Sequence, residues 1–235
     1  MAESDEPVLI VGGGPTGLAA SLLLSRHGVR SLLAERHPGT SVHPKARGLN
    51  VRTLELFRVW GLEPTVHAAA ADLDRAVEVA WAPTLAGPET RRVRYGGAGE
   101  QRPADSPAGS VACAQDKLER VLADAARSYR LGELRFGHEL TSVAPDDAGV
   151  RAVITDRASG RETTVRARYL IAADGAQSPV RSRLGIGMAG PGVLAHRAGI
   201  YFRADLAEVA ASRPALLYLV GPPGAAGVMA PVKPG

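Results

Sequence analysis

The feature that most constrains the fold is a glycine cluster close to the start of the chain. A short apolar run, residues 8–11, leads into Gly12, Gly14 and Gly17, which stand at the spacing G-x-G-x-x-G, and a helix-forming run follows at once. In this spacing the first glycine makes a tight turn, the second lets the backbone approach a pyrophosphate, and the third allows a helix to pack closely on a strand. The amides that open the helix would face the phosphates. The stretch predicts a dinucleotide site, with an ordinary strand-to-helix turn as the alternative.

A second strand completes a βαβ unit. The helix is expected over about residues 15–27, and residues 31–35 form an apolar run that ends in an acid. This acid, Glu35, stands 18 residues after Gly17, where a carboxylate accepts hydrogen bonds from an adenosine ribose. Because two anions repel, an acid here also disfavours a 2′-phosphate on the nucleotide. The alternative is a surface glutamate at the end of a strand.

The rest of the chain mixes helical and β patterns, which predicts an α/β fold. Helices are expected at residues 51–60, after an Asn50 cap, near 64–74, and at 115–129, with a short helix beginning within 176–181. Strands are expected at residues 76–81, 91–95, 133–136, 139–143, 150–155, 162–167, 169–173, 199–203 and 216–220. Residues 96–110 are rich in Gly, Pro, Ala and Ser, and are expected to form a loop.

Composition excludes several classes of protein. An apolar content of 45% and a charged content of 22% are typical of a soluble globular protein, and no apolar run is long enough to cross a bilayer. Residues 1–7 are acidic and polar, unlike a secretory signal, and Cys113 is the only cysteine. A disulfide framework is therefore excluded, and a cytoplasmic location without membrane partners is expected.

Neither nucleic acid nor a metal ion is an expected ligand. The net charge is +4, but the basic residues are scattered among 24 acids and only 4% of the residues are aromatic. This pattern favours a solvated surface. The six histidines show no metal-ligand spacing, and Cys113 has the small, apolar neighbours of a packed thiol.

Three segments together resemble a known family. They are the glycine cluster with Glu35-Arg36, the stretch 43–56 (His-Pro-Lys-Ala-Arg-Gly-Leu-Asn-Val-Arg-Thr-Leu-Glu-Leu), and the stretch 169–181 with its Asp-Gly pair and later Ser and Arg. In this order and spacing they are similar to the N-terminal half of the class A flavin-dependent aromatic hydroxylases, the para-hydroxybenzoate hydroxylase type. The polyketide and phenol hydroxylases of antibiotic biosynthesis are the most similar members. The resemblance covers essentially the whole chain.

The resemblance implies a domain organisation. It implies an α/β, Rossmann-like FAD-binding domain with a parallel sheet and a β-meander, followed by the start of a β-rich substrate domain. Residues 1–75 and 110–190 would form the discontinuous FAD-binding domain, and residues 76–109 and 191–235 would form part of the substrate-binding domain.

The resemblance also implies roles for single residues. The pyrophosphate of FAD would be wrapped by Gly12, Gly14, Pro15, Thr16 and Gly17. Glu35 would hold the adenosine ribose, Arg36 would lie along the adenine, and Arg47 with Gly48 would approach the flavin. Gln115 would hydrogen-bond the cofactor, and Asp174 with Gly175 would serve FAD and the pyridine nucleotide. Each polar residue has a structural alternative: a solvated arginine for Arg47, the first residue of a helix for Gln115, a turn aspartate for Asp174, and capping or bracing of a helix for Ser178 and Arg181.

The implied activity is hydroxylation of a small aromatic substrate, phenolic or polyketide, by NAD(P)H and O₂, with no catalytic residue assigned. Family members are about twice this length, beyond the usual size of one domain, and carry a third FAD motif that begins with Gly-Asp, a pair absent from this sequence. We therefore expect a truncated or split form that alone binds FAD weakly or not at all and does not hydroxylate; in the split form a partner chain would supply the C-terminal half. A non-catalytic dinucleotide-binding module and an NAD-dependent oxidoreductase are the alternatives.

Overall fold

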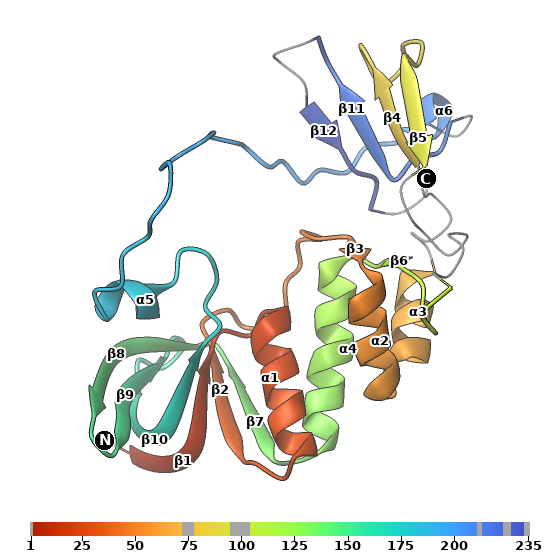
Figure 1. Cartoon of the computed structure of the whole chain (residues 1–235). Helices are drawn as coiled ribbons and strands as arrows, with labels where there is room; N and C mark the ends of the chain where they lie inside the picture. Colours follow the sequence, from red (N-terminus) through yellow and green to blue (C-terminus); the bar gives the residue numbers. More distant parts are fainter. Residues whose placement is uncertain (1, 72–77, 95–103, 211–212, 223–226, 233–235) are drawn as a thin grey trace. The chain divides into compact units, whose positions relative to one another are not determined.

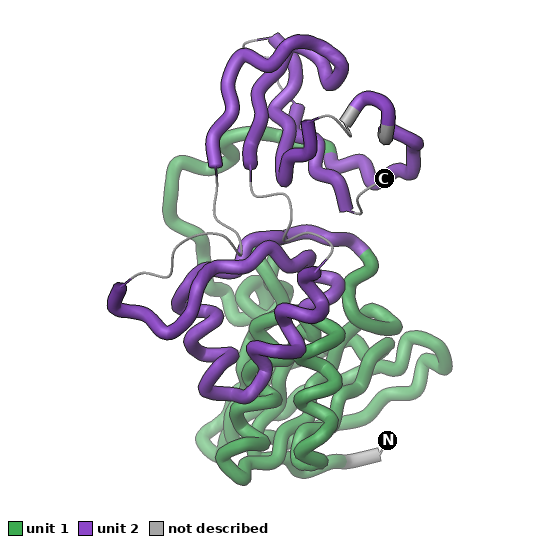
Figure 2. The backbone as a smooth tube through the Cα atoms, turned by 90° about the vertical axis from the view of Figure 1, so that its right-hand side faces the viewer, with its two compact units in different colours: residues 1–42, 119–198 green, residues 43–118, 199–235 purple. Residues whose placement is uncertain are grey.

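The computed structural model describes all residues except 1, 72–77, 95–103, 211–212, 223–226 and 233–235. The chain divides into two compact units, each built from two separate segments (Figure 2). Unit 1 comprises Met1–Val42 and Glu119–Ala198, and unit 2 comprises His43–Leu118 and Gly199–Gly235. The assignment of residues 1–75 and 110–190 to cofactor binding, and of the remaining residues to substrate binding, stays a prediction.

Unit 1 is built on a six-stranded sheet of order β7-β2-β1-β10-β9-β8 (Figure 1). Its strands are β1 (Ala2–Val11), β2 (Ser31–Glu35), β7 (Gly132–Phe136), β8 (His138–Asp146), β9 (Gly149–Asp156) and β10 (Glu162–Ala172). Strands β7, β2, β1 and β10 are parallel to one another, whereas β8, β9 and β10 form an antiparallel meander. The predicted α/β class, with a parallel sheet and a β-meander, is confirmed.

Helix α1 (Pro15–Arg26) connects β1 to β2 and packs on β1, β2 and β7. Its fully buried Leu18 and Leu22 stand four residues apart and so share one face of the helix. Proline suits the first helical position because its ring fixes φ and no intrahelical partner is lost there. After the helix, Gly28 adopts a φ of +77°, and its N–H donates to Ser25 O, as expected at a helix end.

A layer of apolar residues lies on the sheet of unit 1. Alternate residues of a strand share one face, so this layer takes every second residue from each strand. The cluster contains Leu9, Val11, Leu32, Ala34, Leu140, Ala152, Ile154, Val165, Ala167 and Val180. It joins the parallel and antiparallel parts of the sheet, and Val180 adds the short helix α5 (Pro179–Arg183) to the same core.

Unit 2 contains a four-stranded sheet of order β12-β11-β4-β5 and a two-stranded β3-β6 ladder. Its strands are β3 (Gly48–Leu49), β4 (Glu78–Ala82), β5 (Arg91–Arg94), β6 (Val111–Ala112), β11 (Leu217–Val220) and β12 (Gly227–Met229), and its helices are α2 (Val51–Val59), α3 (Glu63–Ala70) and α6 (Ala207–Ala210). Helix α4 (Gln115–Ser128) contains the division between the units. The predicted cap of α2 is confirmed, because Asn50 Oδ1 accepts the N–H of Thr53 at 2.9 Å.

Two β predictions need correction. The stretches 162–167 and 169–173 are one strand, β10, because β1 begins at Ala2 and offers it a parallel partner along its full length. Residues 199–203, which include the apolar run Ile200-Tyr201-Phe202, form no strand, since no strand of the described chain pairs with them. The predicted loop at 96–110 falls largely outside the described residues, as do parts of the elements expected near 64–74, 76–81 and 91–95.

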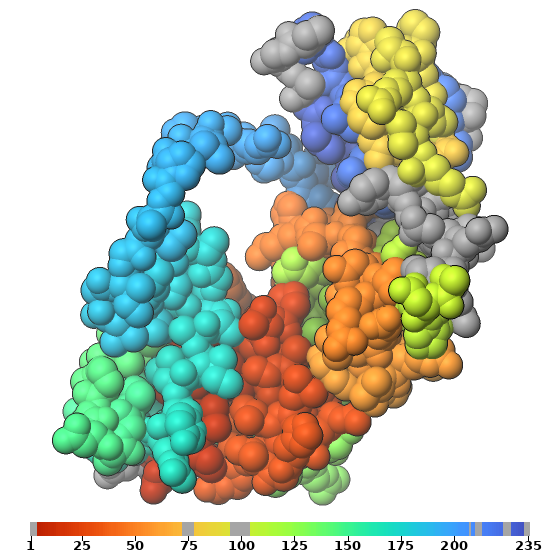
Figure 3. All heavy atoms as spheres, in the orientation of Figure 1, coloured from red at the N-terminus to blue at the C-terminus, as the bar shows by residue number. Residues whose placement is uncertain are grey.

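The irregular stretch 184–202 exposes many large apolar side chains. Figure 3 shows the atoms of this stretch in cyan to blue. The exposed side chains are Leu184, Ile186, Met188, Val193, Leu194, Ile200, Tyr201 and Phe202.

None of the described helices combines the length and the apolar character that crossing a bilayer requires.

Candidate functional site

The glycine turn has the geometry that its spacing predicts. Gly12 has a φ of +107°, and a Cβ there would lie 2.3 Å from the carbonyl oxygen of Ala173. A Cβ at Gly17 would lie 1.9 Å from the carbonyl oxygen of Gly12, whereas a Cβ at Gly14 would meet nothing within 4 Å. Gly12 and Gly17 are therefore required by the fold, and Gly14 leaves open space in front of the backbone.

This turn lies at the carboxyl ends of β1 and β10. Along the chain, β1 is followed by β2 on one side of it, while β10 pairs with its other side. In open α/β sheets, ligands bind in the crevice outside such a change of direction. The N–H of Gly12 donates to Ala34 O and that of Ala173 to Val11 O, which ties the ends of the three strands together.

The first turn of α1 presents free amides at the same place. Gly14 is the N-cap with extended backbone, and the first helical hydrogen bond runs from Leu18 N–H to Gly14 O at 3.0 Å. The amides of Thr16 and Gly17 precede that bond and so have no acceptor within the helix. Together with the positive end of the helix dipole, they can bind a phosphate group.

Glu35, at the end of β2, points back toward the glycine turn. Its Oε2 accepts the N–H of Gly13 at 2.6 Å, and its Oε1 lies 2.8 Å from the backbone N of His37 and 2.5 Å from His37 Nδ1. A Cβ at Gly13 would lie 2.8 Å from Cβ and 2.9 Å from Cγ of Glu35, so only glycine fits there. The side chain of Glu35 is only 12% exposed, unlike a free surface glutamate.

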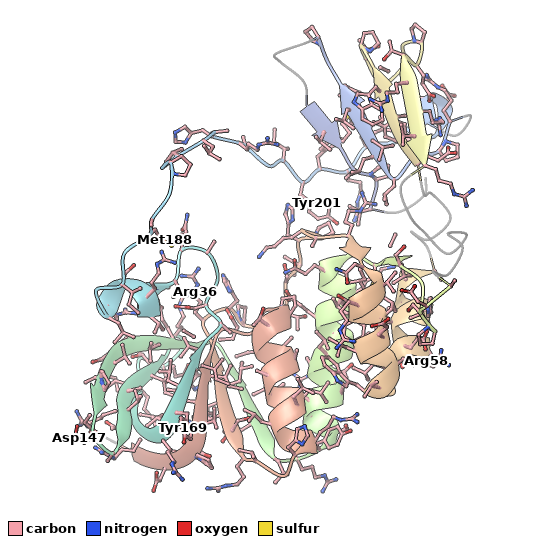
Figure 4. All side chains as sticks on the ribbon, in the orientation of Figure 1. Arg36, Arg58, Asp147, Tyr169, Met188 and Tyr201 are labelled. Atoms are coloured by element: carbon pink, nitrogen blue, oxygen red, sulfur yellow. The ribbon has the colours of Figure 1, made fainter. Side chains whose placement is uncertain are left out.

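Two of these residues were not predicted to take part in the site. Gly13 is not a position of the G-x-G-x-x-G fingerprint, and its signal in the sequence is only that all three residues of 12–14 are glycine. His37 follows Glu35 by two residues in a turn, and nothing in the sequence indicated that its ring folds back. Arg36 is exposed and extends from the same carboxyl edge of the sheet (Figure 4).

Asp174 is held by the short helix that follows it. Its Oδ1 accepts the hydroxyl of Ser178 at 2.5 Å, and its Oδ2 accepts the N–H of Val180 at 2.9 Å. Ser178 also caps α5 by accepting the N–H of Arg181, and the Arg181 guanidinium donates to Ala176 O at 2.8 Å. The capping and bracing roles considered for Ser178 and Arg181 are therefore present. Gly175, with a φ of +89°, makes the turn between strand and helix.

The loop 43–48 is fixed within unit 2 by the start of α4. Gln115 donates its N–H to Ala46 O at 2.9 Å, and its side-chain oxygen accepts the N–H of Ala46 at 3.4 Å. The N–H of Cys113 donates to Arg47 O at 2.8 Å, and Gly48 pairs with Ala112 in the β3-β6 ladder. The backbone beside Arg47 is thus held on both sides.

Arg47 uses its side chain to brace unit 2. One guanidinium nitrogen donates to Leu216 O at 3.0 Å and another donates to Pro231 O. Desolvation by burial lowers the pKa of Arg47 from its usual value, yet an arginine at this depth remains charged. Its predicted place against a flavin is therefore not its contact in this structure, and that role stays a prediction.

The predicted site residues fall into two groups. Gly12, Gly14, Pro15, Thr16, Gly17, Glu35, Arg36, Asp174 and Gly175 belong to unit 1, where they lie along one edge of the sheet, and Arg47, Gly48 and Gln115 belong to unit 2. Among the described residues, no group of three or more His, Cys, Asp or Glu side chains could hold a metal ion. Unit 1 thus offers an anion-binding helix start between two fixed carboxylates.

Comparisons with known proteins show the family of this chain. A family model described as "FAD binding domain" matches residues 5–234. The chain belongs to the FAD-binding class A monooxygenase family. A "Putative polyketide hydroxylase" of Streptomyces halstedii is 47% identical over 231 residues, which cover 96% of this chain and 41% of that protein.

Solved structures of family members share the fold. The flavin-dependent monooxygenase PieE, solved with FAD and substrate, is 42% identical with a TM-score of 0.83, and the match covers 100% of this chain and 42% of that one. Aklavinone-11 hydroxylase, solved with FAD and aklavinone, is 33% identical with a TM-score of 0.78, covering 97% of this chain and 44% of that one. The chain spans about two fifths of the length of the relatives that it matches.

Proposed function

We propose that this chain carries the FAD-binding part of an NAD(P)H- and O₂-dependent monooxygenase that hydroxylates an aromatic substrate of the phenolic or polyketide class. Family membership supports the cofactor, and the relatives named above are hydroxylases and monooxygenases. These proteins extend well beyond the matched region, so hydroxylation is proposed for the complete protein. A partner chain or a continuation that supplies the remaining part is included in this proposal.

The observation that carries the proposal is the fixed position of Glu35 beside the glycine turn. FAD joins an adenosine and a flavin through a pyrophosphate, so its adenosine half needs a phosphate site and a hydroxyl acceptor a short distance apart. The amides at the start of α1 provide the first, and Glu35, bonded to Gly13 within that turn, provides the second. Neither feature needs any movement of the chain.

Each predicted residue then has a task that its own chemistry supports. Gly12 and Gly17 shape the turn, Gly14, Pro15 and Thr16 open the helix toward the pyrophosphate, and Asp174 with Gly175 offers a fixed carboxylate to a ribityl or ribose hydroxyl. Arg36 would lie along the adenine, and Arg47, Gly48 and Gln115 would approach the flavin. Bound FAD would supply the redox chemistry with NAD(P)H and O₂, while the protein binds and orients it.

The absorption spectrum of the freshly purified chain tests this proposal. Bound FAD gives a flavin spectrum, whereas an NAD-dependent oxidoreductase gives none, and titration of the apo-protein with FAD or NAD⁺ separates these two outcomes. FAD affinity without oxidation of NAD(P)H, followed by substrate-stimulated oxidation once the C-terminal part of a relative is added, supports a split or truncated hydroxylase. FAD affinity that never yields such oxidation favours a non-catalytic module. Failure to bind any dinucleotide, even once the C-terminal part of a relative is added, would refute the proposed site.

A further inference from the structure

We propose that His37 is a positioning residue for nucleotide recognition: its imidazole holds the Glu35 carboxylate so that Oε2 accepts a hydroxyl of the adenosine ribose. The inference rests on the proposed function, but it concerns a residue to which the glycine fingerprint and the family resemblance give no role.

Three N–H groups are directed at the two oxygens of this carboxylate. Oε1 is approached by the backbone N–H of His37 and by Nδ1 of its ring, and Oε2 by the N–H of Gly13. An ionised carboxylate only accepts hydrogen bonds, with about two acceptor positions on each oxygen. Oε1 is therefore saturated, and Oε2 keeps one open position beside the glycine turn. A ribose hydroxyl would donate to Oε2.

The carboxylate also fixes the hydrogen-bonding state of the ring. Because Oε1 cannot donate, Nδ1 of His37 must carry the hydrogen, whether or not Nε2 is protonated as well. If the ring were removed, Oε1 would regain an open position and the carboxylate would lose one of its three restraints. The two backbone N–H groups that remain, one on each oxygen, would hold the carboxylate less firmly, and its bond to the ribose hydroxyl would weaken.

The backbone of His37 is anchored independently of its ring. His37 O accepts the N–H of Gly137 at 2.7 Å, in the turn between β7 and β8, and the N–H of Arg157 donates to Gly137 O. The guanidinium of Arg157 donates to Arg36 O at 3.2 Å. The ring itself is 63% exposed, so substitutions at His37 remove the side-chain contact without opening a cavity in the core. This makes the ring testable by mutation.

A binding cycle between protein and ligand tests the inference. The affinities of ADP, 2′-deoxy-ADP and 3′-deoxy-ADP are measured by calorimetry for the full chain and for the variants His37→Ala, His37→Asn and Glu35→Gln. For the wild type, we expect ADP to bind about tenfold more tightly than whichever of 2′-deoxy-ADP and 3′-deoxy-ADP binds more weakly. This ratio of affinities is the scale of one hydrogen bond to a charged group. In His37→Ala this ratio should fall to about threefold or less. A purely structural role would weaken all three ligands equally.

Asparagine serves as the conservative replacement. Its side-chain amide nitrogen stands as many bonds from the backbone as Nδ1 of histidine and also donates, so His37→Asn should keep most of the wild-type ratio. Glu35→Gln should abolish it. A His37→Ala variant that keeps the full ratio while binding ADP overturns the role of His37 alone. A wild-type chain that binds no ADP at millimolar concentration refutes the nucleotide site, and with it this inference.

A ligand-free measurement supplies an independent readout. In amide NMR spectra, the resonance of Gly13 reports its bond to Glu35 Oε2, and Glu35→Gln should shift it. We expect His37→Ala to shift it in the same direction and His37→Asn to leave it near its wild-type position. A Gly13 resonance that responds to Glu35→Gln but not to His37→Ala would contradict the proposed restraint.

Discussion

The carbonyl oxygen of Gly12 lies 1.9 Å from the position that a Cβ of Gly17 would occupy. Because this oxygen belongs to the backbone, it cannot move away from a Cβ at Gly17 unless β1 also moves relative to α1. Gly14 differs from Gly12 and Gly17, because a Cβ at Gly14 would meet nothing within 4 Å. Substitutions at these positions therefore separate the demands of folding from those of binding.

We predict that Gly17→Ala lowers the free energy of unfolding by about 1–3 kcal/mol or more, as overpacking does, and reduces dinucleotide affinity as well. Gly14→Ala, at a φ of −74°, should change stability by less than about 1 kcal/mol, the usual scale of an N-cap change. It should still weaken FAD binding, because its methyl group occupies the space in front of the helix start. Urea unfolding and FAD titration check the pair. Equal losses of stability would contradict this assignment.

The bonds of Asp174 predict a local effect of substitution. In Asp174→Asn one oxygen is replaced by an amide group that cannot accept the Val180 N–H or the Ser178 hydroxyl. We expect a loss of about 1–2 kcal/mol in stability, the scale of a lost cap or hydrogen bond. Faster hydrogen exchange at the amides of Val180 and Arg181 should accompany it. Arg168→Gln, just upstream, is the control, and exchange within α5 should not change there.

A glycine in β7 faces two serines of α1. A Cβ at Gly132 would lie 2.4 Å from Ser21 Oγ and 3.1 Å from Ser25 Oγ, and both hydroxyls are buried without a hydrogen-bond partner in the described chain. We predict that Gly132→Ala destabilises by about 1–3 kcal/mol. Ser21→Ala should be neutral or stabilising, since it removes an unpaired buried hydroxyl. The double variant should recover most of the loss in urea unfolding, whereas strict additivity would show that the two sites do not clash.

One carboxylate of unit 2 predicts an acid-dependent stability. The guanidinium of Arg92 hydrogen-bonds Glu89 and lowers the pKa of Glu89 from its usual 4.5. Glu89 therefore binds a proton more readily in the unfolded chain than in the folded chain. The stabilisation of the folded state by the ionised Glu89 is complete above the pKa of Glu89 in the unfolded chain. It is lost as the pH falls through the folded pKa. Between about pH 5 and pH 3, the Tm of the wild type should fall more steeply than that of Glu89→Gln. The exposed Glu162→Gln is the matched control, and its curve should follow the wild type.

Local sequence signals predicted much of the molecule. The glycine spacing predicted the turn, the helix and the second strand, because each depends on residues within one βαβ unit. The Asn50 cap and the Ser178 cap were likewise readable, since a capping side chain bonds to a residue three positions away. The prediction of a strand at residues 199–203 was wrong because a strand also requires a neighbouring strand to pair with, which a short apolar run does not encode.

Most of the contacts that were missed join residues distant in sequence, although the contact of His37 Nδ1 with Glu35 spans only two residues. The polar start of β1 forms a strand because β10 pairs with it. At this point Ala2 pairs with Thr163, which lies 161 residues further along the chain. The fit of Gly13 against Glu35, 22 residues apart, depends on the packing of α1 on β1 and β2. Arg47 reaches carbonyl oxygens 169 and 184 residues away. Such partners follow from the tertiary fold and have no local pattern.

The donors around Glu35 also bear on the redesign of nucleotide preference. If Glu35 were replaced by serine, the N–H groups of Gly13 and His37, together with His37 Nδ1–H, would lose their shared acceptor. Three converging donors beside a vacated volume form a site for an anion. A 2′-phosphate of a bound nucleotide could then take the place of the Glu35 carboxylate. The N–H groups that now bond to Glu35 would bind this phosphate, so the protein would need no new arginine.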